Sequence, residues 1–268
     1  MTASAYKAIG ILDSGVGGLT VFQEIIRQLP HEKIIYFGDT ARMPYGPRPD
    51  EEVRRFALQI IDFLRNQEVK MVVVACNTAT AAGLSHYRAH CDIPVVGVIE
   101  PGVRAALTYT RSGRIGVIGT AGTIRSSAYQ KALQEARPDV HIIAKACPLF
   151  VLLVENDLVH TPEAEQVAEV YLAPFREAAV DTLILGCTHY PLMSDLIQST
   201  VGPQVQLVNS AEEIAREVKD ILDKQGLHNP LKCSDPGYRF FVSGNPHSFK
   251  EIASKMLRRH IEAYQVLL

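Results

Sequence analysis

The sequence predicts an α/β protein of two similar, doubly wound and mostly parallel domains. They are related by approximate internal symmetry, and the active site lies in the cleft between them. Three observations lead to this prediction. Short aliphatic runs alternate with amphipathic stretches along most of the chain. Two stretches that start 106 positions apart have similar sequences, and two aliphatic runs end in a cysteine followed by polar residues. Alternating strands and helices are typical of parallel sheets covered by helices on both faces.

The predicted strands are short runs of aliphatic and β-branched residues bounded by Gly, Pro, Asp or Asn. In chain order we expect strands at 9–12, 33–37, 71–75, 95–99, 115–118, 140–144, 182–185 and 206–208. Amphipathic stretches between them predict helices at 51–66, 124–136 and 162–178. The last of these helices has Thr161 as its expected N-cap and Pro162 at its first helical position.

A weak internal repeat supports two related domains. The stretch IGILDSG at 9–15 resembles IGVIGTAG at 115–122, an offset of 106 residues. Each leads to a proline, Pro30 or Pro138, at an offset of 108, and then to a cysteine, Cys76 or Cys187, at an offset of 111. A slowly drifting offset indicates a duplication with short insertions. We therefore expect a first domain of residues 1–98 and 209–268, and a second domain of residues 99–208.

The tail from about residue 211 has no counterpart after the first cysteine. It predicts a helix at 211–224, a strand at 238–242 and a helix at 248–264. We expect this tail to complete the first domain.

Composition excludes several classes of protein. A formal net charge of -2 gives no indication of a nucleic-acid partner or an anionic membrane surface. The longest apolar runs, such as 149–154, are far too short to span a bilayer. Asp13 interrupts the N-terminus before a signal-peptide core could form, so we expect a cytoplasmic protein.

The cysteines predict reduced thiols and no metal site. The chain has 5 cysteines, an odd number, without the closely spaced pairs that zinc or thioredoxin-type sites use. They are Cys76, Cys91, Cys147, Cys187 and Cys233. Most free cysteines are simply small buried hydrophobic residues, so the position of Cys76 and Cys187 after predicted strands is what distinguishes them.

Polar residues follow the predicted strands where a parallel α/β sheet binds its ligands. They are Asp13-Ser14, Tyr45-Gly46, Asn77-Thr78 and Thr188-His189, and Glu155 ends the apolar run 149–154. Each has a simpler structural explanation when taken alone, since such residues also cap helices and form turns. Their shared position at one predicted edge favours a common site.

The loop DSGVGG at 13–18 raises a dinucleotide-binding alternative. It follows a strand, and Asp39 lies about where a ribose-binding acid would. However, the G-x-G-x-x-G pattern requires a glycine where this chain has Thr20, and Asp13 would repel a pyrophosphate.

Six motifs in this order closely resemble glutamate racemase. They are DSGVGGLT, YFGDTARMPYG, ACNTATA, VIEPG, GTAGT and LGCTHYPL, and they run from about Ile9 to Leu192. The resemblance implies interconversion of L- and D-glutamate without pyridoxal phosphate, metal or ATP, and a supply of D-glutamate for peptidoglycan. It further implies that Cys76 takes the α-proton from D-glutamate and that Cys187 takes it from L-glutamate.

The resemblance also assigns the remaining site residues. Asp13, Glu155 and His189 match polar residues that assist the thiols. The implied substrate contacts are Asp13, Ser14, Tyr45, Gly46, Asn77, Thr78, Thr120, Thr123, Thr188 and His189.

The chemistry of racemisation suits two thiols on opposite faces of the substrate. A proton leaves one face of Cα and another arrives on the opposite face, so two acid–base groups avoid any turning of the substrate. Neighbouring imidazolium or N–H groups would favour the reactive thiolate, and His189 is two residues from Cys187. The alternatives are an aspartate racemase or other two-cysteine isomerase, a dinucleotide-binding oxidoreductase, and a two-lobed binding protein without turnover. The sequence does not determine the oligomeric state, and we keep a homodimer open.

Overall fold

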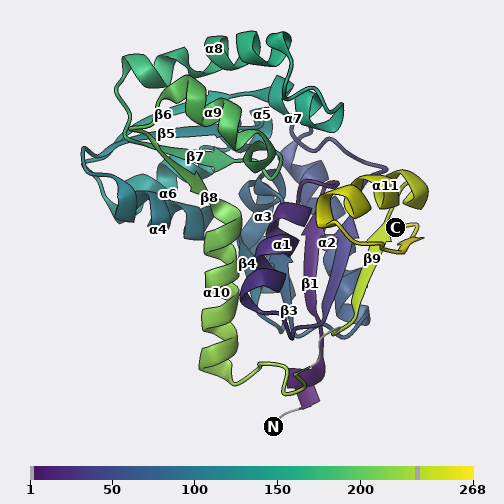
Figure 1. The fold of residues 1–268 in the computed structure, drawn as a ribbon. Coiled ribbons are helices and arrows are strands. Elements are labelled where there is room, and N and C mark those ends of the chain that lie inside the picture. Colours follow the sequence, from purple (N-terminus) through teal and green to yellow (C-terminus); the bar gives the residue numbers. More distant parts are fainter. Residues whose placement is uncertain (1–2, 233–235) are drawn as a thin grey trace.

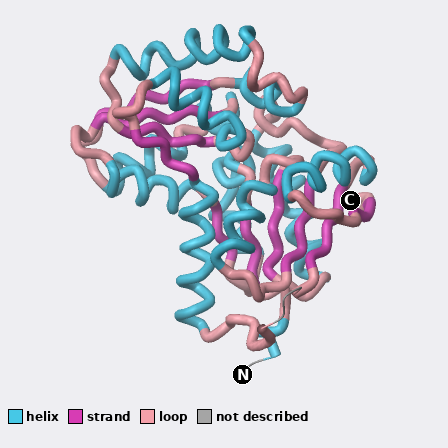
Figure 2. Tube along the Cα trace, in the orientation of Figure 1, coloured by secondary structure: helices cyan, strands magenta, loops and turns pink. Residues whose placement is uncertain are grey.

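The computed structural model describes residues 3–232 and 236–268, so the predicted free thiol Cys233 lies outside the described residues. The described chain forms two parallel β-sheets, each covered by helices, that lie one above the other in Figure 1. Figure 2 shows the same two layers with the strands of the larger sheet running toward the smaller one. The fold is the two-part α/β arrangement that the sequence predicts.

The first sheet has six strands in the order β10-β9-β2-β1-β3-β4. Their bounds are Ile9–Asp13 (β1), Ile34–Gly38 (β2), Met71–Val74 (β3), Val95–Gly97 (β4), Tyr238–Val242 (β9) and Ala263–Gln265 (β10). The second sheet has four strands in the order β6-β5-β7-β8. Their bounds are Arg114–Gly119 (β5), His141–Ala146 (β6), Thr182–Gly186 (β7) and Gln206–Asn209 (β8).

The internal repeat is visible in the strand order. Every pairing between the described strands is parallel. In the first sheet β1 lies between β2 and β3, with β4 beyond β3, and in the second sheet β5 lies between β6 and β7, with β8 beyond β7. The register matches as well, since Ile9 lies beside Ile34 and Ile115 beside Ile142. Cys76 and Cys187 therefore follow equivalent strands, β3 and β7.

Helices cover both faces of each sheet because successive side chains of a buried strand point to opposite faces. One face of the first sheet packs against α1 (Leu19–Gln28), α10 (Ser210–Gln225) and α11 (Pro246–Leu257). Its other face packs against α2 (Asp50–Asn66) and α3 (Asn77–His90). In the second sheet, α7 (Pro148–Glu155), α8 (Pro162–Glu177) and α9 (Ser194–Val201) cover one face, and α4 (Ile99–Tyr109) and α6 (Ala128–Ala136) the other. The short helices are η1 (Ala3–Tyr6), α5 (Ala121–Arg125) and η2 (Tyr190–Met193).

The two halves exchange one helix each. Helix α4 follows β4 of the first sheet, yet Ile99, Val103 and Ala106 pack in the core of the second sheet. Helix α10 follows β8 of the second sheet, yet its apolar side chains pack against α1 in the core of the first. Figure 1 shows α10 descending from the upper sheet to lie beside α1. The chain thus crosses between the halves at 98–99 and at 209–210.

Three predicted elements need correction. The expected helix at 124–136 is two helices, α5 and α6, because Ser127 adopts a left-handed backbone conformation with φ of 55°. The helix expected at 248–264 ends at Leu257, where Arg258 is left-handed with φ of 50°, and 263–265 form β10 instead. The strand expected at 95–99 ends at Gly97, and Ile99 begins α4.

The tail has one counterpart that the sequence does not reveal. Helix α10 corresponds to α4, because each follows the fourth strand of its repeat, so the expectation that the whole tail lacks a counterpart is wrong. Strands β9 and β10 join the first sheet beside β2, and the second sheet has no such addition among the described strands. The predicted N-cap of α8 is confirmed, since the Thr161 side chain accepts the N–H of Ala164. Within the described residues, no helix is both long and apolar enough to cross a membrane.

Candidate active site

A cavity of about 240 Å³ lies between the two halves. It is found where the carboxyl ends of β1 and β3 face those of β5 and β7, the edge at which parallel sheets bind ligands. Its first-half lining is Ser14, Met43, Pro44, Tyr45, Gly46, Pro47, Cys76, Asn77 and Thr78. Its second-half lining is Thr120, Ala121, Pro148, Val151, Leu152, Glu155, Cys187, Thr188 and His189.

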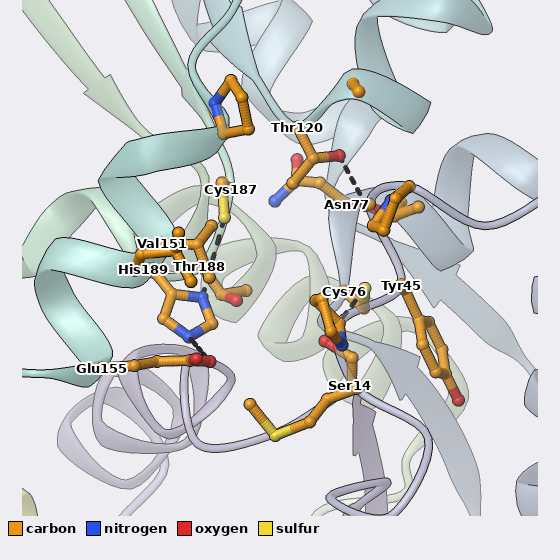
Figure 3. A pocket seen from close by; sticks show the side chains of 18 residues that line it. Ser14, Tyr45, Cys76, Asn77, Thr120, Val151, Glu155, Cys187, Thr188 and His189 are labelled. Carbon is orange, nitrogen blue, oxygen red and sulfur yellow. Dashed lines mark hydrogen bonds and ion pairs between the residues drawn. The ribbon is translucent and has the colours of Figure 1, made fainter.

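The two thiols lie on opposite sides of this cavity (Figure 3). Cys187 lies on one side together with His189 and Glu155, and Cys76 lies on the other beside Ser14. Both cysteines are only 5% exposed, so each sulfur is largely shielded from solvent. The structure therefore brings together the two residues that the repeat relates by sequence, one from each half.

Cys76 occupies the N-cap of α3, and only Ala75 separates it from the end of β3. Its Sγ accepts the N–H of Ala79 at 3.4 Å and lies 3.9 Å from Ser14 Oγ. Burial and the charge of Asp13 together raise the pKa of the Cys76 thiol to about 12, against the opposing effect of the contacts with Ala79 and Ser14. Without substrate the group is therefore a protonated thiol at neutral pH.

Cys187 has a different environment because an imidazole lies beside it. Its Sγ is 3.7 Å from His189 Nδ1, and His189 Nε2 is 3.2 Å from Glu155 Oε1. Burial lowers the pKa of His189, but the hydrogen bonds with Cys187 and Glu155 outweigh it and raise that pKa to about 10. A protonated imidazole donates from both ring nitrogens, so it directs one N–H and its positive charge at the Cys187 sulfur.

Asp13 lies behind the cavity and does not line it. Its carboxylate is fully buried and accepts the N–H groups of Gly15 at 3.1 Å and Gly18 at 2.9 Å. It also accepts the hydroxyl of Thr188 at 3.4 Å, which links the two halves. Burial raises the pKa of Asp13, while the nearby charge of His189 and the loop N–H groups oppose the rise.

These contacts argue against the dinucleotide alternative. In a nucleotide-binding turn the loop N–H groups bind the pyrophosphate, but here the Asp13 carboxylate occupies those of Gly15 and Gly18. A Cβ on Gly18 would lie 2.4 Å from Asp13 Cβ, so glycine is required there for close packing. Close packing against Asp13 therefore explains this glycine-rich turn without a bound nucleotide.

Asp39 orients the Tyr45-Gly46 loop instead of binding a ribose. Its buried carboxylate accepts the Tyr45 hydroxyl, the Arg42 Nε at 2.8 Å and the Ser243 hydroxyl at 2.6 Å. The Tyr45 hydroxyl thus engages Asp39, and Gly46 O accepts the N–H of Gly122 at 2.8 Å from the opposite half. Ser243 follows β9, so the strands added to the first sheet support this loop.

Three threonines join the halves at another wall of the site. Thr78 Oγ1 is 2.8 Å from Thr120 Oγ1, which is in turn 3.0 Å from Thr123 Oγ1. Thr78 and Thr120 line the cavity, whereas Thr123 is fully buried behind them. Of the predicted substrate contacts, Asp13 and Thr123 are the two that the described cavity lining does not include.

Apolar side chains of the cavity were not predicted from the sequence. Val151, Leu152 and Glu155 lie on one face of α7 and line the cavity, while Phe150 and Leu153 face the core. The 3.6-residue period within the run 149–154 could have indicated this division, because it separates 151, 152 and 155 from 150 and 153. Met43 and Pro44 complete the apolar lining.

The arrangement provides two acid–base groups, hydrogen-bond donors and apolar walls around one small cavity. In residues 3–232 and 236–268, no three His, Cys, Asp or Glu side chains gather as they would around a metal ion. Such a site can bind a small polar molecule and move protons at its two faces.

Comparison with known proteins agrees with this geometry. Residues 9–218 match the family model described as Asp/Glu/Hydantoin racemase. A glutamate racemase of Geobacter metallireducens is 52% identical over 265 residues, which are 98% of this chain and 97% of that protein. This chain belongs to the glutamate racemase family. The family is one of isomerases, and the resemblance read from the six motifs is confirmed.

Solved structures of glutamate racemases share the whole fold. One from Bacillus anthracis is 47% identical and superimposes with a TM-score of 0.94, covering 98% of each chain. One from Francisella tularensis, in complex with D-glutamate, is 34% identical with a TM-score of 0.92 and also covers 98% of each chain. The glutamate racemase fold therefore accounts for both sheets and for the tail.

Proposed function

We propose that this protein interconverts L- and D-glutamate by two-base proton transfer at Cα, with Cys76 and Cys187 as the two bases. The observation that carries the proposal is that these thiols line opposite sides of one cavity, each at the end of an equivalent strand. Relatives of similar length are named glutamate racemases, and one neighbouring structure holds D-glutamate. Both findings favour glutamate over aspartate as the substrate.

Each thiol serves one face of the substrate. Cys187 takes the α-proton from L-glutamate while Cys76 delivers one to the opposite face, and the roles reverse with D-glutamate. The differing environments support this division in the free enzyme: Cys76 is held as a thiol, and the imidazolium of His189 faces Cys187. An enzyme with a protonated Cys76 and a protonated His189 beside Cys187 is ready to accept L-glutamate.

The carbanion formed at Cα requires stabilisation by donors directed at the α-carboxylate. Asn77, Thr78 and Thr188 line the cavity between the thiols and are suitable donors. Ser14 and the Tyr45-Gly46 loop are our candidates for the side-chain carboxylate. The apolar walls exclude water, which strengthens each of these interactions.

His189, Glu155 and Asp13 assist these thiols. His189 donates to Cys187, and Glu155 keeps the imidazole protonated through their 3.2 Å contact. Asp13 is buried away from the cavity, so we assign it the positioning of Gly15, Gly18 and Thr188 in place of direct proton transfer. Thr123 acts in the same way on Thr120.

The wider role is a proposal that membership of the family supports. We propose that the reaction proceeds without a cofactor, in the cytoplasm, and supplies D-glutamate for peptidoglycan. We also propose residues 1–98 with 209–268 and residues 99–208 as the two domains, a division supported by the crossings at 98–99 and 209–210. The homodimer stays a prediction, which light scattering of the purified protein tests.

Circular dichroism of the substrate tests the proposal. Purified protein without added cofactor, dialysed against a chelator and treated with a carbonyl reagent, should bring either glutamate enantiomer to a near-equal mixture. D-Aspartate serves as the control and should react poorly. Loss of signal with aspartate but not glutamate would overturn the substrate assignment. Binding of glutamate without any loss of optical activity would favour the two-lobed binding protein.

A further inference from the structure

Asn77, which follows Cys76, is hydrogen-bonded from the opposite half of the molecule. The hydroxyl of Tyr129, a residue of α6, lies 2.7 Å from Asn77 Oδ1 and 3.3 Å from Ser210 Oγ. Tyr129 is fully buried, and its side chain does not line the cavity. One phenol therefore joins α6 of the second half, the start of α3 in the first, and the start of the exchanged helix α10.

The ring of Tyr129 also lies against the turn that carries Cys187. A Cβ on Gly186, the residue before Cys187, would lie 3.1 Å from Tyr129 Cε2. A Cβ on Gly102 of α4 would lie 3.6 Å from the Tyr129 ring and 2.8 Å from Ser210 Oγ. These glycines provide the space for the ring, so a single side chain contacts the chain beside both cysteines.

The hydrogen-bond roles follow from the chemistry of the groups. Burial raises the pKa of the Tyr129 phenol, and the contact with Ser210 opposes the rise, so the phenol keeps its proton at neutral pH. Its one proton goes to Asn77 Oδ1, and Ser210 then donates to the phenol oxygen. With Oδ1 engaged, the other end of the Asn77 amide, the Nδ2 donor, is the end available to the cavity that Asn77 lines.

We propose that Tyr129 is a positioning residue, which fixes the Asn77 amide with its N–H₂ donor toward the substrate. The inference rests on the proposed function, because it assumes that a carboxylate occupies the cavity. A reversed amide would direct its oxygen at that carboxylate and repel it. The phenol opposes this reversal, because in the observed arrangement its proton goes to Asn77 Oδ1 and the Ser210 hydroxyl is left to donate to the phenol oxygen.

The residue that follows the other cysteine is held in a reciprocal manner. Thr188, after Cys187, donates to Asp13 Oδ1 at 3.4 Å, and its carbonyl accepts the Thr20 hydroxyl at 3.3 Å, both from the first half. Each half thus holds the residue beside the other half's cysteine. The donor of Asn77 is consequently oriented only while the two halves are together.

Kinetics of Tyr129→Phe test this inference. The ring remains, and only the hydroxyl is lost. We expect kcat/KM to fall by about tenfold to a hundredfold in both directions, the range expected when a buried partner is left unsatisfied. Tyr87→Phe is the matched control, because that buried hydroxyl donates to the Ala79 carbonyl at 3.0 Å and Tyr87 is not among the residues that line the cavity. The control should lose comparable stability and keep its kcat/KM within about twofold.

A double-mutant cycle separates positioning from a structural role. Asn77→Ala alone should lower kcat/KM, and adding Tyr129→Phe to it should lower kcat/KM no further. Equal effects of Tyr129→Phe in both backgrounds would overturn the inference, as would wild-type kcat/KM in Tyr129→Phe. If Tyr129→Phe does not fold, Asn77→Asp replaces it. That variant keeps the acceptor for the phenol but lacks the donor, so full activity in Asn77→Asp would refute the assigned orientation.

The outcomes also separate this inference from the proposed function. A wild-type protein that neither racemises glutamate nor binds D-glutamate by calorimetry would refute both. A wild-type protein that racemises glutamate, with no kinetic defect in Tyr129→Phe, would refute the role of Tyr129 alone.

Discussion

Substitution of Gly17 by alanine is expected to force apart the two turns that meet beside the cavity. Gly17 lies in the first half, in the turn after β1, and a Cβ added to it would lie 2.5 Å from Thr188 Oγ1 and 2.7 Å from His189 Nδ1. Ordinary contact distances are about 3.5 Å, so the nearest atom must retreat by about 1 Å. Its backbone φ is not positive, so alanine adds no conformational strain of its own.

The neighbours of Gly17 have little freedom to move. The Thr188 hydroxyl donates to Asp13, and His189 is held between Cys187 and Glu155. Overpacking of this kind costs about 1–3 kcal/mol of unfolding free energy. A displacement of about 1 Å in a catalytic group can lower the rate by about a hundredfold. We therefore expect kcat/KM to fall by about that factor, with a smaller effect on stability.

Gly15→Ala is the matched control in the same turn. Its added Cβ would approach only Met43, with Sδ at 3.3 Å, and the end of a methionine side chain moves readily. Urea denaturation and the circular dichroism assay of racemisation measure both quantities. A Gly17→Ala protein with wild-type kcat/KM and stability would refute the close packing of these two turns.

Two further predictions concern charge. Burial lowers the pKa of His189, but the hydrogen bonds with Cys187 and Glu155 outweigh it and raise that pKa from 6.5 to about 10. Protonated His189 therefore stabilises the folded protein fully below pH 6.5, and this contribution is lost as the pH rises through 10. Over that pH window the unfolding free energy of the wild-type protein should fall by on the order of a few kcal/mol. The fall should be smaller in His189→Gln, and an equal fall in both proteins would contradict the prediction. Asp39→Asn removes the anionic acceptor of the Tyr45 hydroxyl, so it should lower the unfolding free energy by about 2 kcal/mol and raise KM for glutamate. An unchanged KM would show that the Tyr45-Gly46 loop does not depend on Asp39.

Much of the fold was predictable because its signals are local. Strands such as 71–74 and 182–186 are aliphatic runs that end at a small or polar residue, and the ends of parallel strands meet at one edge. That geometry brought Cys76 and Cys187 together as the repeat predicts. The helix at 248–264 was overextended because the left-handed residue that ends it is Arg258, whereas such an end is usually marked by Gly or Asn.

The less predictable parts depend on contacts between distant residues. Tyr129 reads in sequence as an ordinary core residue of an amphipathic helix, and its bond to Asn77 spans 52 positions. Asp39 has the spacing of a ribose-binding acid, yet Ser243, 204 positions away, is among its partners. The exchange of α4 and α10 also leaves no local mark, since an amphipathic helix does not specify which sheet it will cover.

Racemisation in D₂O from a single enantiomer, sampled early, tests the two-base claim most directly. If Cys76 and Cys187 each serve one face, the newly formed enantiomer should carry deuterium at Cα, because its hydrogen comes from a solvent-equilibrated thiol. The remaining starting enantiomer should stay largely protiated while transfer to product outpaces return to the same face. The same labelling should be found whether the reaction starts from L- or D-glutamate. Product that retains the original protium would instead indicate a single base serving both faces, and would contradict the account.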